Sequence, residues 1–342
     1  MKKYISIIFI CVFLCSYKNA EAQELPIYSQ YMFNEYLINS AYAGTYDVTP
    51  IIINHRNQWA GFGESTPKTS SISGHTRLGD KSAIGSSIIF DKTSPISRTQ
   101  IETSYGYHVI LRKKGNLMLS MALSGTLNML QYTYQENITY SEMMDGSMDD
   151  VNQGNENSSA GDINFGMVMF NDYFDFGFSI KNLLSSEPSS SNPEEDIQRV
   201  KYIVLHGSYL GRNNPQSPIG IIPSFVIRKM GLISYNSLFQ LDLNVKVIYR
   251  NKIWGGIAYR THEKAVCPLI GFNTGKVFVG WSYDVGTSQL GSYHNGSHNI
   301  AIGINIGQQN KHKIRNQNPF HLNINSNWDM KLPAIKKHKS AI

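Results

Sequence analysis

The sequence predicts an all-β protein: a transmembrane antiparallel β-barrel of about fourteen strands, with a short N-terminal plug or cap segment and a basic C-terminal tail. Three observations lead to this fold. The chain begins with an export signal, apolar and polar residues alternate with a period of two from about residue 50 to residue 308, and the predicted connections sort by length. Alternation alone also fits a soluble β-sandwich. Short turns at one end and long loops at the other are typical of outer-membrane barrels and favour the barrel.

Residues 1–22 have the pattern of a secretory signal peptide. Lys2 and Lys3 precede an apolar core, and Ala20-Glu21-Ala22 provides small residues before a cleavage point at Gln23. The apolar core is shorter than the roughly 20 residues needed to span a bilayer, which argues against an anchor. We therefore expect a cleaved signal and a location in the outer membrane of a Gram-negative bacterium. Cys267 is then the single cysteine of the mature chain, so no intramolecular disulfide is expected.

The fourteen predicted strands share the alternation of apolar with polar or glycine residues. They cover residues 50–58, 68–78, 82–91, 97–111, 115–131, 160–171, 172–181, 199–211, 217–229, 235–250, 252–262, 265–274, 275–285 and 297–308. In residues 241–247, for example, Leu and Val alternate with Asp242, Asn244 and Lys246. The apolar face would contact lipid and the polar face would line a wet lumen. Pro223 and Pro268 fall inside strands, where each lacks a ladder donor, so these two strands are the least regular.

Loop lengths orient the predicted barrel. If the N-terminus is periplasmic, the periplasmic connections are short, and the long ones (59–67, 131–160, 182–197 and 286–296) are external. Aromatic residues are available for girdles at the two lipid–water boundaries. They are Tyr105, Tyr107, Tyr132, Tyr134, Tyr249, Tyr259 and Trp281.

The basic charge is confined to the chain ends. Three basic residues lie in 1–22 and seven in 309–342, which leaves 21 basic and 23 acidic residues, a net charge of −2, in residues 23–308. This balance excludes nucleic acid as a partner of the whole domain. The tail is expected to be a disordered periplasmic extension, with an electrostatic tether to an acidic partner or a membrane surface as the alternative.

No motif for catalysis, metal or cofactor binding is present, so we predict a protein that is not an enzyme and has no cofactor. The sequence lacks G-x-S-x-G, H-E-x-x-H and a phosphate loop. An acidic loop at 142–162 lacks the spacing of a calcium site. His55, His75, His108 and His206 lie on separate strands and would meet in the lumen only as structural groups or, less readily, as part of an embedded hydrolase.

The segment between the signal and the first strand is aromatic and rich in Asn, Gln and Ser, and it lacks strand alternation. Tyr28-Ser29-Gln30-Tyr31-Met32-Phe33-Asn34, followed by Asn39-Ser40-Ala41-Tyr42-Ala43-Gly44, resembles the N-terminal motif of the PorP/SprF family of type IX secretion system membrane proteins. His55 to Trp59 with Gly61 and Gly63, then Pro67-Lys68-Thr69, Asp91 and Tyr105 to His108, extend the resemblance. Ser40 departs from the usual Pro, and the basic tail has no counterpart in the family pattern.

The resemblance implies a non-enzymatic outer-membrane barrel that assists export or surface anchoring of large adhesins and other sorting-domain proteins, in some members for gliding motility. Implied partners are periplasmic ring or lipoprotein components, a secreted surface adhesin and outer-membrane lipid. A general or solute-selective channel is the alternative function, because fourteen strands enclose a lumen too wide for strand side chains to fill.

The predicted organisation is a signal peptide at 1–22, a periplasmic or plug segment at 23–48, a barrel at 49–308 and a tail at 309–342. Plugging of the lumen and docking on a periplasmic partner are equally open roles for the segment. The residues assigned to one role or the other are Tyr28, Ser29, Gln30, Tyr31, Met32, Phe33, Asn34, Asn39, Tyr42, Ala43, Gly44, Arg56, Gln58 and Trp59.

Overall fold

The structure is a computed structural model. It describes residues 31, 33–46, 48–61, 66–112, 116–132, 156–184, 201–211, 217–230, 239–250, 252–274, 276–287 and 295–307. The predicted signal peptide and basic tail lie outside the described residues, as do Tyr28, Ser29, Gln30 and Met32 of the family motif.

Fourteen strands form the molecule, which confirms the predicted fold class. They are β1 (Thr49–Asn57), β2 (Lys68–Leu78), β3 (Ser82–Thr93), β4 (Ile96–Arg112), β5 (Leu117–Tyr132), β6 (Glu156–Phe170), β7 (Phe174–Lys181), β8 (Tyr202–Tyr209), β9 (Ile219–Met230), β10 (Phe239–Tyr249), β11 (Ile253–Arg260), β12 (Ala265–Asn273), β13 (Val277–Gly286) and β14 (Ser297–Ile306).

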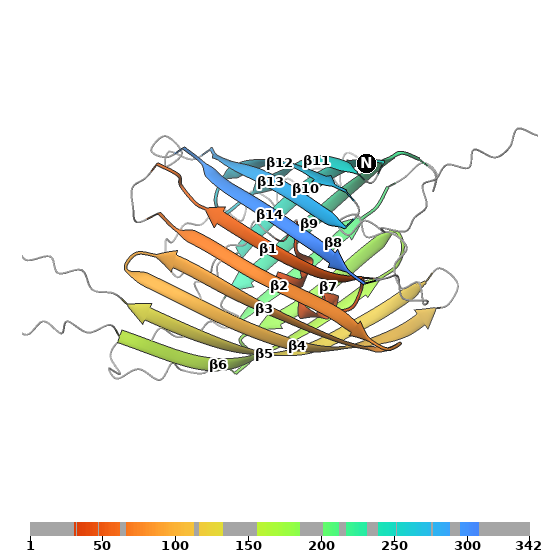
Figure 1. Ribbon diagram of the computed structural model, residues 1–342, viewed down its shortest axis with the longest axis horizontal. Coiled ribbons are helices and arrows are strands. Elements are labelled where there is room, and N and C mark those ends of the chain that lie inside the picture. Colours follow the sequence, from red (N-terminus) through yellow and green to blue (C-terminus); the bar gives the residue numbers. More distant parts are fainter. Residues whose placement is uncertain are drawn as a thin grey trace, which may run out of the picture.

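The strands make a closed antiparallel meander (Figure 1). Each strand pairs with its neighbour in sequence, and β1 pairs with β14 from Thr49↔Ile306 to Asn57↔His298. Closure leaves no edge strand, so every strand has a hydrogen-bonded partner on both sides. No helix among the described residues has the length and apolarity needed to cross a bilayer.

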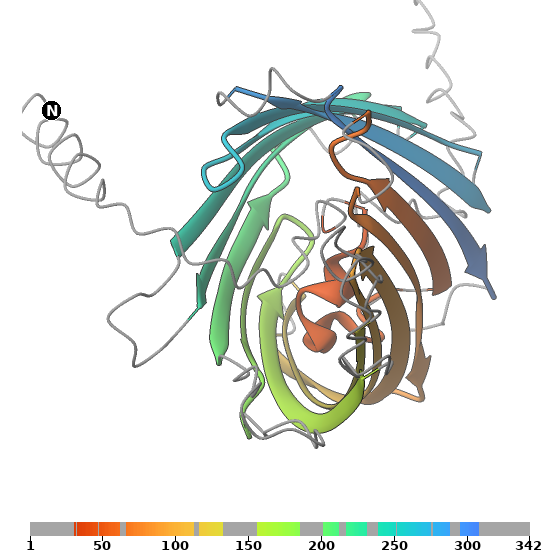
Figure 2. The same cartoon turned by 90° about the vertical axis from the view of Figure 1, so that its left-hand side faces the viewer.

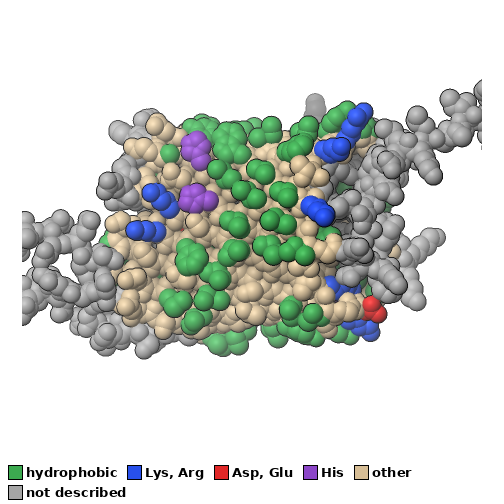
Figure 3. All heavy atoms as spheres, viewed as in Figure 1, with side chains coloured by type: hydrophobic (Ala, Val, Ile, Leu, Met, Phe, Trp, Pro, Cys, Tyr) green, Lys and Arg blue, Asp and Glu red, His purple; other side chains and the backbone are tan. Residues whose placement is uncertain are grey.

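The alternation predicted from the sequence sorts side chains between the two faces of the barrel. On β10, Gln240, Asp242, Asn244 and Lys246 are buried and face the interior, whereas the intervening Leu243, Val245 and Val247 are exposed. Figure 3 shows the result on one side of the molecule, where hydrophobic side chains form a band and Lys and Arg gather toward the two ends. An apolar band of this kind is the surface that lipid covers.

Aromatic residues lie at both margins of this band. Tyr105, Tyr107 and Tyr249 are exposed near the end with short turns, while Tyr259 and Trp281 are exposed near the opposite end. Tyr134 lies outside the described residues. The two groups are placed as interfacial girdles are in outer-membrane barrels.

Pro223 and Pro268 sit where the ladder is already interrupted, and Pro50, the second residue of β1, pairs with β14 only. Pro223 pairs with Val245 of β10, while the pairing of β8 with β9 ends one residue short of it. Pro268 pairs with Ile257 of β11, while the pairing of β12 with β13 skips it. Each proline therefore has an intact ladder on one side only, which accommodates a residue without an N–H.

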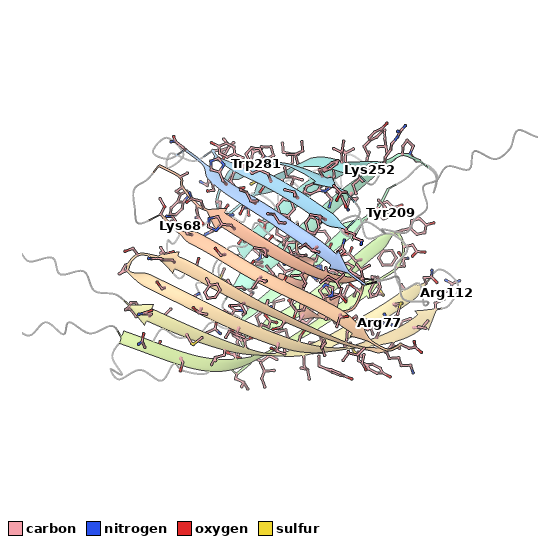
Figure 4. All side chains as sticks on the ribbon, in the orientation of Figure 1. Lys68, Arg77, Arg112, Tyr209, Lys252 and Trp281 are labelled. Carbon is pink, nitrogen blue, oxygen red and sulfur yellow. The ribbon has the colours of Figure 1, made fainter. Side chains whose placement is uncertain are left out.

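The connections differ between the two ends, as the loop lengths predicted. Short turns join β2 to β3, β6 to β7, β10 to β11 and β12 to β13 at one end. At the other end, β1, β5, β7 and β13 finish and β2, β6, β8 and β14 begin, each pair separated by ten or more residues of sequence; the tight turn at Ser94-Pro95 is also at this end. We call these the short-turn end and the long-loop end. In Figure 4, Arg77, Arg112, Tyr209 and Lys252 mark the short-turn end, and Lys68 and Trp281 lie toward the long-loop end.

Candidate functional site

The lumen contains the described residues that precede β1. Two 3-10 turns, η2 (Glu35–Leu37) and η3 (Ser40–Tyr42), lie inside the ring of strands (Figure 2). We call Tyr31 together with residues 33–46 the luminal segment; all of these residues are buried. Because the segment is short and irregular, its stability depends on contacts with the wall rather than on helix formation.

The luminal segment runs along the lumen rather than across one mouth. Tyr31 lies beside Arg228, two residues before the long-loop end of β9. At the other end of the segment, the Gly44 carbonyl accepts a hydrogen bond of 3.4 Å from Arg77 Nη1, near the short-turn end of β2. The segment thus occupies the interior between the two ends.

Asn39 is the central polar contact. Its side-chain oxygen accepts a hydrogen bond from Ala41 N at 3.0 Å and caps η3. Its amide nitrogen lies 3.1 Å from the carbonyl oxygens of Met167 and Phe178 and 3.0 Å from His206 Nε2. One side chain therefore orders the turn and also joins it to β6, β7 and β8.

Glycines on the inner wall make room for the segment. A Cβ at Gly166 would collide with the Asn39 side chain, and a Cβ at Gly85 would lie 2.7 Å from the Tyr36 ring. At Gly280 a Cβ would lie 2.7 Å from the Phe33 ring. Since real Cβ contacts are not that short, any other residue at these three positions would force the segment or the wall to shift.

Two tyrosines of the segment join it to the wall by their hydroxyl groups. Tyr36 Oη lies 2.7 Å from Ser104 Oγ, and Tyr42 donates to Asp175 Oδ1 at 2.7 Å. Burial, reinforced by the negative charge of Glu102, raises the pKa of Tyr36 above its ordinary value. Its phenol is therefore neutral at physiological pH.

The first residues of the segment pack on the opposite wall. The rings of Phe33 and Trp254 have centroids 5.3 Å apart, and the guanidinium of Arg228 lies 5.5 Å from the Tyr31 ring centre. Arg228 also pairs with Asp242 at 2.7 Å. Burial, with Asp242 nearby, raises the pKa of Tyr31, so this phenol is also neutral.

A buried ion pair lies beside the luminal segment, next to Leu37 at the end of η2. Lys181 Nζ of β7 lies 3.1 Å from Glu102 Oε2 of β4, and these strands are not neighbours in the barrel. Lys181 Nζ also lies 3.5 Å from the Leu37 carbonyl oxygen, and Ser124 donates to Glu102 at 2.6 Å. The pair links two separated parts of the wall to the end of η2.

A second ionic cluster lies in the wall near the long-loop end. Arg56 of β1 contacts Glu263 at 3.0 Å and Asp284 at 3.1 Å, and Arg260 contacts the same two carboxylates, each at 3.0 Å. Two cations and two anions balance in charge. The cluster ties β1, β11, the β11–β12 turn and β13 together.

The sequence-predicted residues fall in two places. Tyr31, Phe33, Asn34, Asn39, Tyr42, Ala43 and Gly44 lie in the lumen, and Asn34 donates to Ser73 Oγ at 2.6 Å. Arg56 is in the ionic cluster, Gln58 N bonds to the Pro67 carbonyl at 2.9 Å, and Trp59 N bonds to Ser297 Oγ at 3.1 Å. The wall partners Gly85, Gly166 and Lys181 were missed; their only sequence signal is glycine or charge on a polar strand face.

Three of the four predicted histidines face the lumen: His75 and His108 both lie beside Gly44, and His206 lies farther along the luminal segment. His55 is on the outer face beside Ser70, His75 accepts from Gly44 N at 3.2 Å, and His206 lies by Asn39 and Tyr42. Within the described part of the chain, no three His, Cys, Asp or Glu side chains gather as possible metal ligands. Most of the acidic loop at 142–162 lies outside that part.

The comparison with protein families decides the family. The family described as type IX secretion system membrane protein PorP/SprF matches residues 20–304, a span that includes the luminal segment and thirteen complete strands. The chain belongs to the PorP/SprF family. Membership makes this chain a barrel of the type IX secretion system, and together with the fold it points to an outer-membrane location and a non-enzymatic role.

Solved structures resemble this PorP/SprF barrel in fold alone. They include the CymD monoaromatic hydrocarbon channel (8% identity, TM-score 0.45, covering 84% of this chain and 95% of that one). The Acinetobacter baumannii outer membrane protein Omp33 (8%, 0.43, 76% and 98%) and the Ralstonia pickettii toluene transporter TbuX (9%, 0.40, 76% and 88%) are further examples. At these TM-scores they support no statement about what this chain binds or transports. No curated protein matches the sequence.

Proposed function

We propose that this PorP/SprF barrel assists the export or cell-surface anchoring of large adhesins and other sorting-domain proteins, including those used in gliding motility. The family match over residues 20–304 is the observation that carries the proposal. Its partners are periplasmic ring or lipoprotein components on one side and the exported adhesin on the other. The protein reaches the outer membrane after cleavage of residues 1–22 and performs no catalysis.

Within this role, the luminal segment is a plug. Its burial, its hydrogen bonds to Ser73, Ser104 and Asp175, and the wall glycines that receive it support this function over docking on a periplasmic partner. A plugged barrel holds a surface protein without leaking solutes. Release of the segment, if the machinery requires it, would break these contacts together.

Deletion of the gene followed by complementation tests the proposal. Surface adhesin would be measured by protease shaving of intact cells and mass spectrometry in the deletion strain and in strains that express the wild-type chain or a Gly166→Val variant. Gly125→Val is the matched control, because a Cβ at Gly125 meets nothing within 4 Å.

We expect surface adhesin to fall in the deletion strain and to return with the wild-type and control chains at equal outer-membrane levels. Unchanged display in a strain without a related gene would contradict the proposal. A fall limited to small-solute uptake would favour the channel function instead.

A further inference from the structure

One row of side chains crosses six adjacent strands on the outer face near the long-loop end. Strand register makes each member the direct cross-strand neighbour of the next. In order from β13 through β14 and β1 to β4, the row consists of Tyr283, His298, Asn57, Lys68, Lys92 and Ser97. We call it the outer polar row.

Two positive charges face each other in this row. Lys68 and Lys92 are paired across β2 and β3 and both are exposed. Directly opposed side chains have Cβ atoms about 4.5–5.5 Å apart, where like charges destabilise a sheet. The adjacent pair, Thr69 and Asp91, bonds at 2.6 Å on the inner face. Among the described residues, neither ammonium group forms an ion pair, so a neutralising anion would have to come from outside this part of the chain.

Polarity declines in steps from this row toward the middle of the barrel. On the same outer face, the next row toward the middle contains Trp281, Ile300, His55, Ser70, Phe90 and Thr99. The row after it contains only aliphatic side chains: Val279, Ile302, Ile53, Ile72, Ile88 and Ile101. Figure 3 shows Lys or Arg and His side chains beside the hydrophobic band at this end. An amphiphile with an anionic head and acyl chains matches this order.

We propose that Lys68 and Lys92 bind the phosphate of a lipid head group in the leaflet at the long-loop end. A phosphate between the two ammonium groups converts their repulsion into two charge-assisted contacts. Its acyl chains extend over the aliphatic row, and Trp281 and Phe90 lie at the level between head group and chains. The site is independent of the secretion role, because it requires only that the barrel sits in a membrane.

The experiment uses the full mature chain in detergent with lipid A that carries two phosphates as the probe. Lipid bound per protein is measured by native mass spectrometry across a lipid titration, with the same lipid after removal of its phosphates as comparator. The test variant is Lys68→Gln/Lys92→Gln. The control is Lys252→Gln/Lys276→Gln, which removes the same charge from exposed positions at the short-turn end.

We expect phosphorylated lipid to bind the wild-type and control chains alike, and the test variant to bind it about tenfold more weakly, since it loses two exposed charge contacts, each of which is individually weak. A Lys68→Arg/Lys92→Arg variant, which keeps the charge, should retain binding. Equal losses in the test and control variants, or equal binding of the dephosphorylated lipid, would overturn the site. An unchanged heat-induced electrophoretic shift establishes that each variant is folded.

Discussion

Individual wall residues hold the luminal segment because its side chains fit closely against wall glycines and form buried hydrogen bonds. Gly166 and Gly85 are depressions in the wall that receive Asn39 and Tyr36, and Asn39 satisfies backbone carbonyls of two strands at once. A glycine in a strand normally weakens it. Here a side chain of the luminal segment fills the space of the missing one, so packing offsets the cost.

Gly166→Val is therefore expected to release the segment while leaving the barrel closed. The added atoms would occupy the position of the Asn39 side chain. Backbone amide exchange over residues 33–46, followed by mass spectrometry, should become at least tenfold faster, a loss of about 1.4 kcal/mol of docking free energy. Gly125→Val should exchange like the wild type. If residues 33–46 of Gly166→Val remain protected from amide exchange, the wall strand rather than the luminal segment has shifted to make room.

Tyr42→Phe is a milder change. It removes the hydroxyl that donates to buried Asp175 but keeps the ring, so the loss is expected to be about 1–3 kcal/mol. Thermal unfolding followed by circular dichroism should show a lower midpoint, whereas Tyr249→Phe, on the lipid-facing surface, should leave it unchanged. An equal drop of the unfolding midpoint in both variants would contradict a stabilising role of the hydrogen bond between Tyr42 and Asp175.

Elements of the barrel that are distant along the strand order are connected directly by an ion pair beside the luminal segment. Lys181 on β7 and Glu102 on β4 meet under η2, across two intervening strands. Neither charge is solvated, so each depends on the other. The pair therefore links two strands of the wall, and its lysine also contacts the Leu37 carbonyl oxygen.

Lys181→Met is expected to destabilise the protein by about 3–5 kcal/mol, because Glu102 would remain buried without its cation. Lys181→Met with Glu102→Met replaces both charges by apolar side chains of similar length and should recover most of the loss. The temperature at which the folded electrophoretic band disappears measures both effects. If the loss of stability in the double variant equals the sum of the losses in Lys181→Met and in Glu102→Met, the two charges are not coupled.

At the level of the whole molecule, a wide polar lumen is occupied by the chain itself. The inner wall of the barrel carries ion pairs and amide side chains, which water would solvate if the luminal segment were absent. The luminal segment covers part of this surface and runs between the two ends, so it is expected to control passage through the barrel.

The mature protein in a planar bilayer should therefore conduct weakly and in brief openings. Deletion of residues 31–46 should give large, steady currents, while truncation of the tail after residue 308 should match the full chain. Large currents from the intact protein that deletion does not change would identify an open pore and contradict plugging.

Local patterns in the sequence were sufficient to predict the local features of this protein. Side-chain alternation has a period of two, so it could be read without knowing what each strand touches, and it predicted fourteen strands and which residues of β7, β10, β13 and β14 face inward. Loop lengths likewise separated the two ends. The motif from Tyr28 to Gly44 indicated the family.

The residues that meet in the lumen could be identified only in the folded barrel. Gly166 and Asn39 lie in different elements, and Lys181 is 79 residues from Glu102, whereas Arg56 is 207 residues from Glu263. Such contacts depend on the register of every strand and on closure of β1 against β14, so no local pattern contains them. A glycine on a polar strand face contacts a side chain of the luminal segment only when the barrel is closed around that segment.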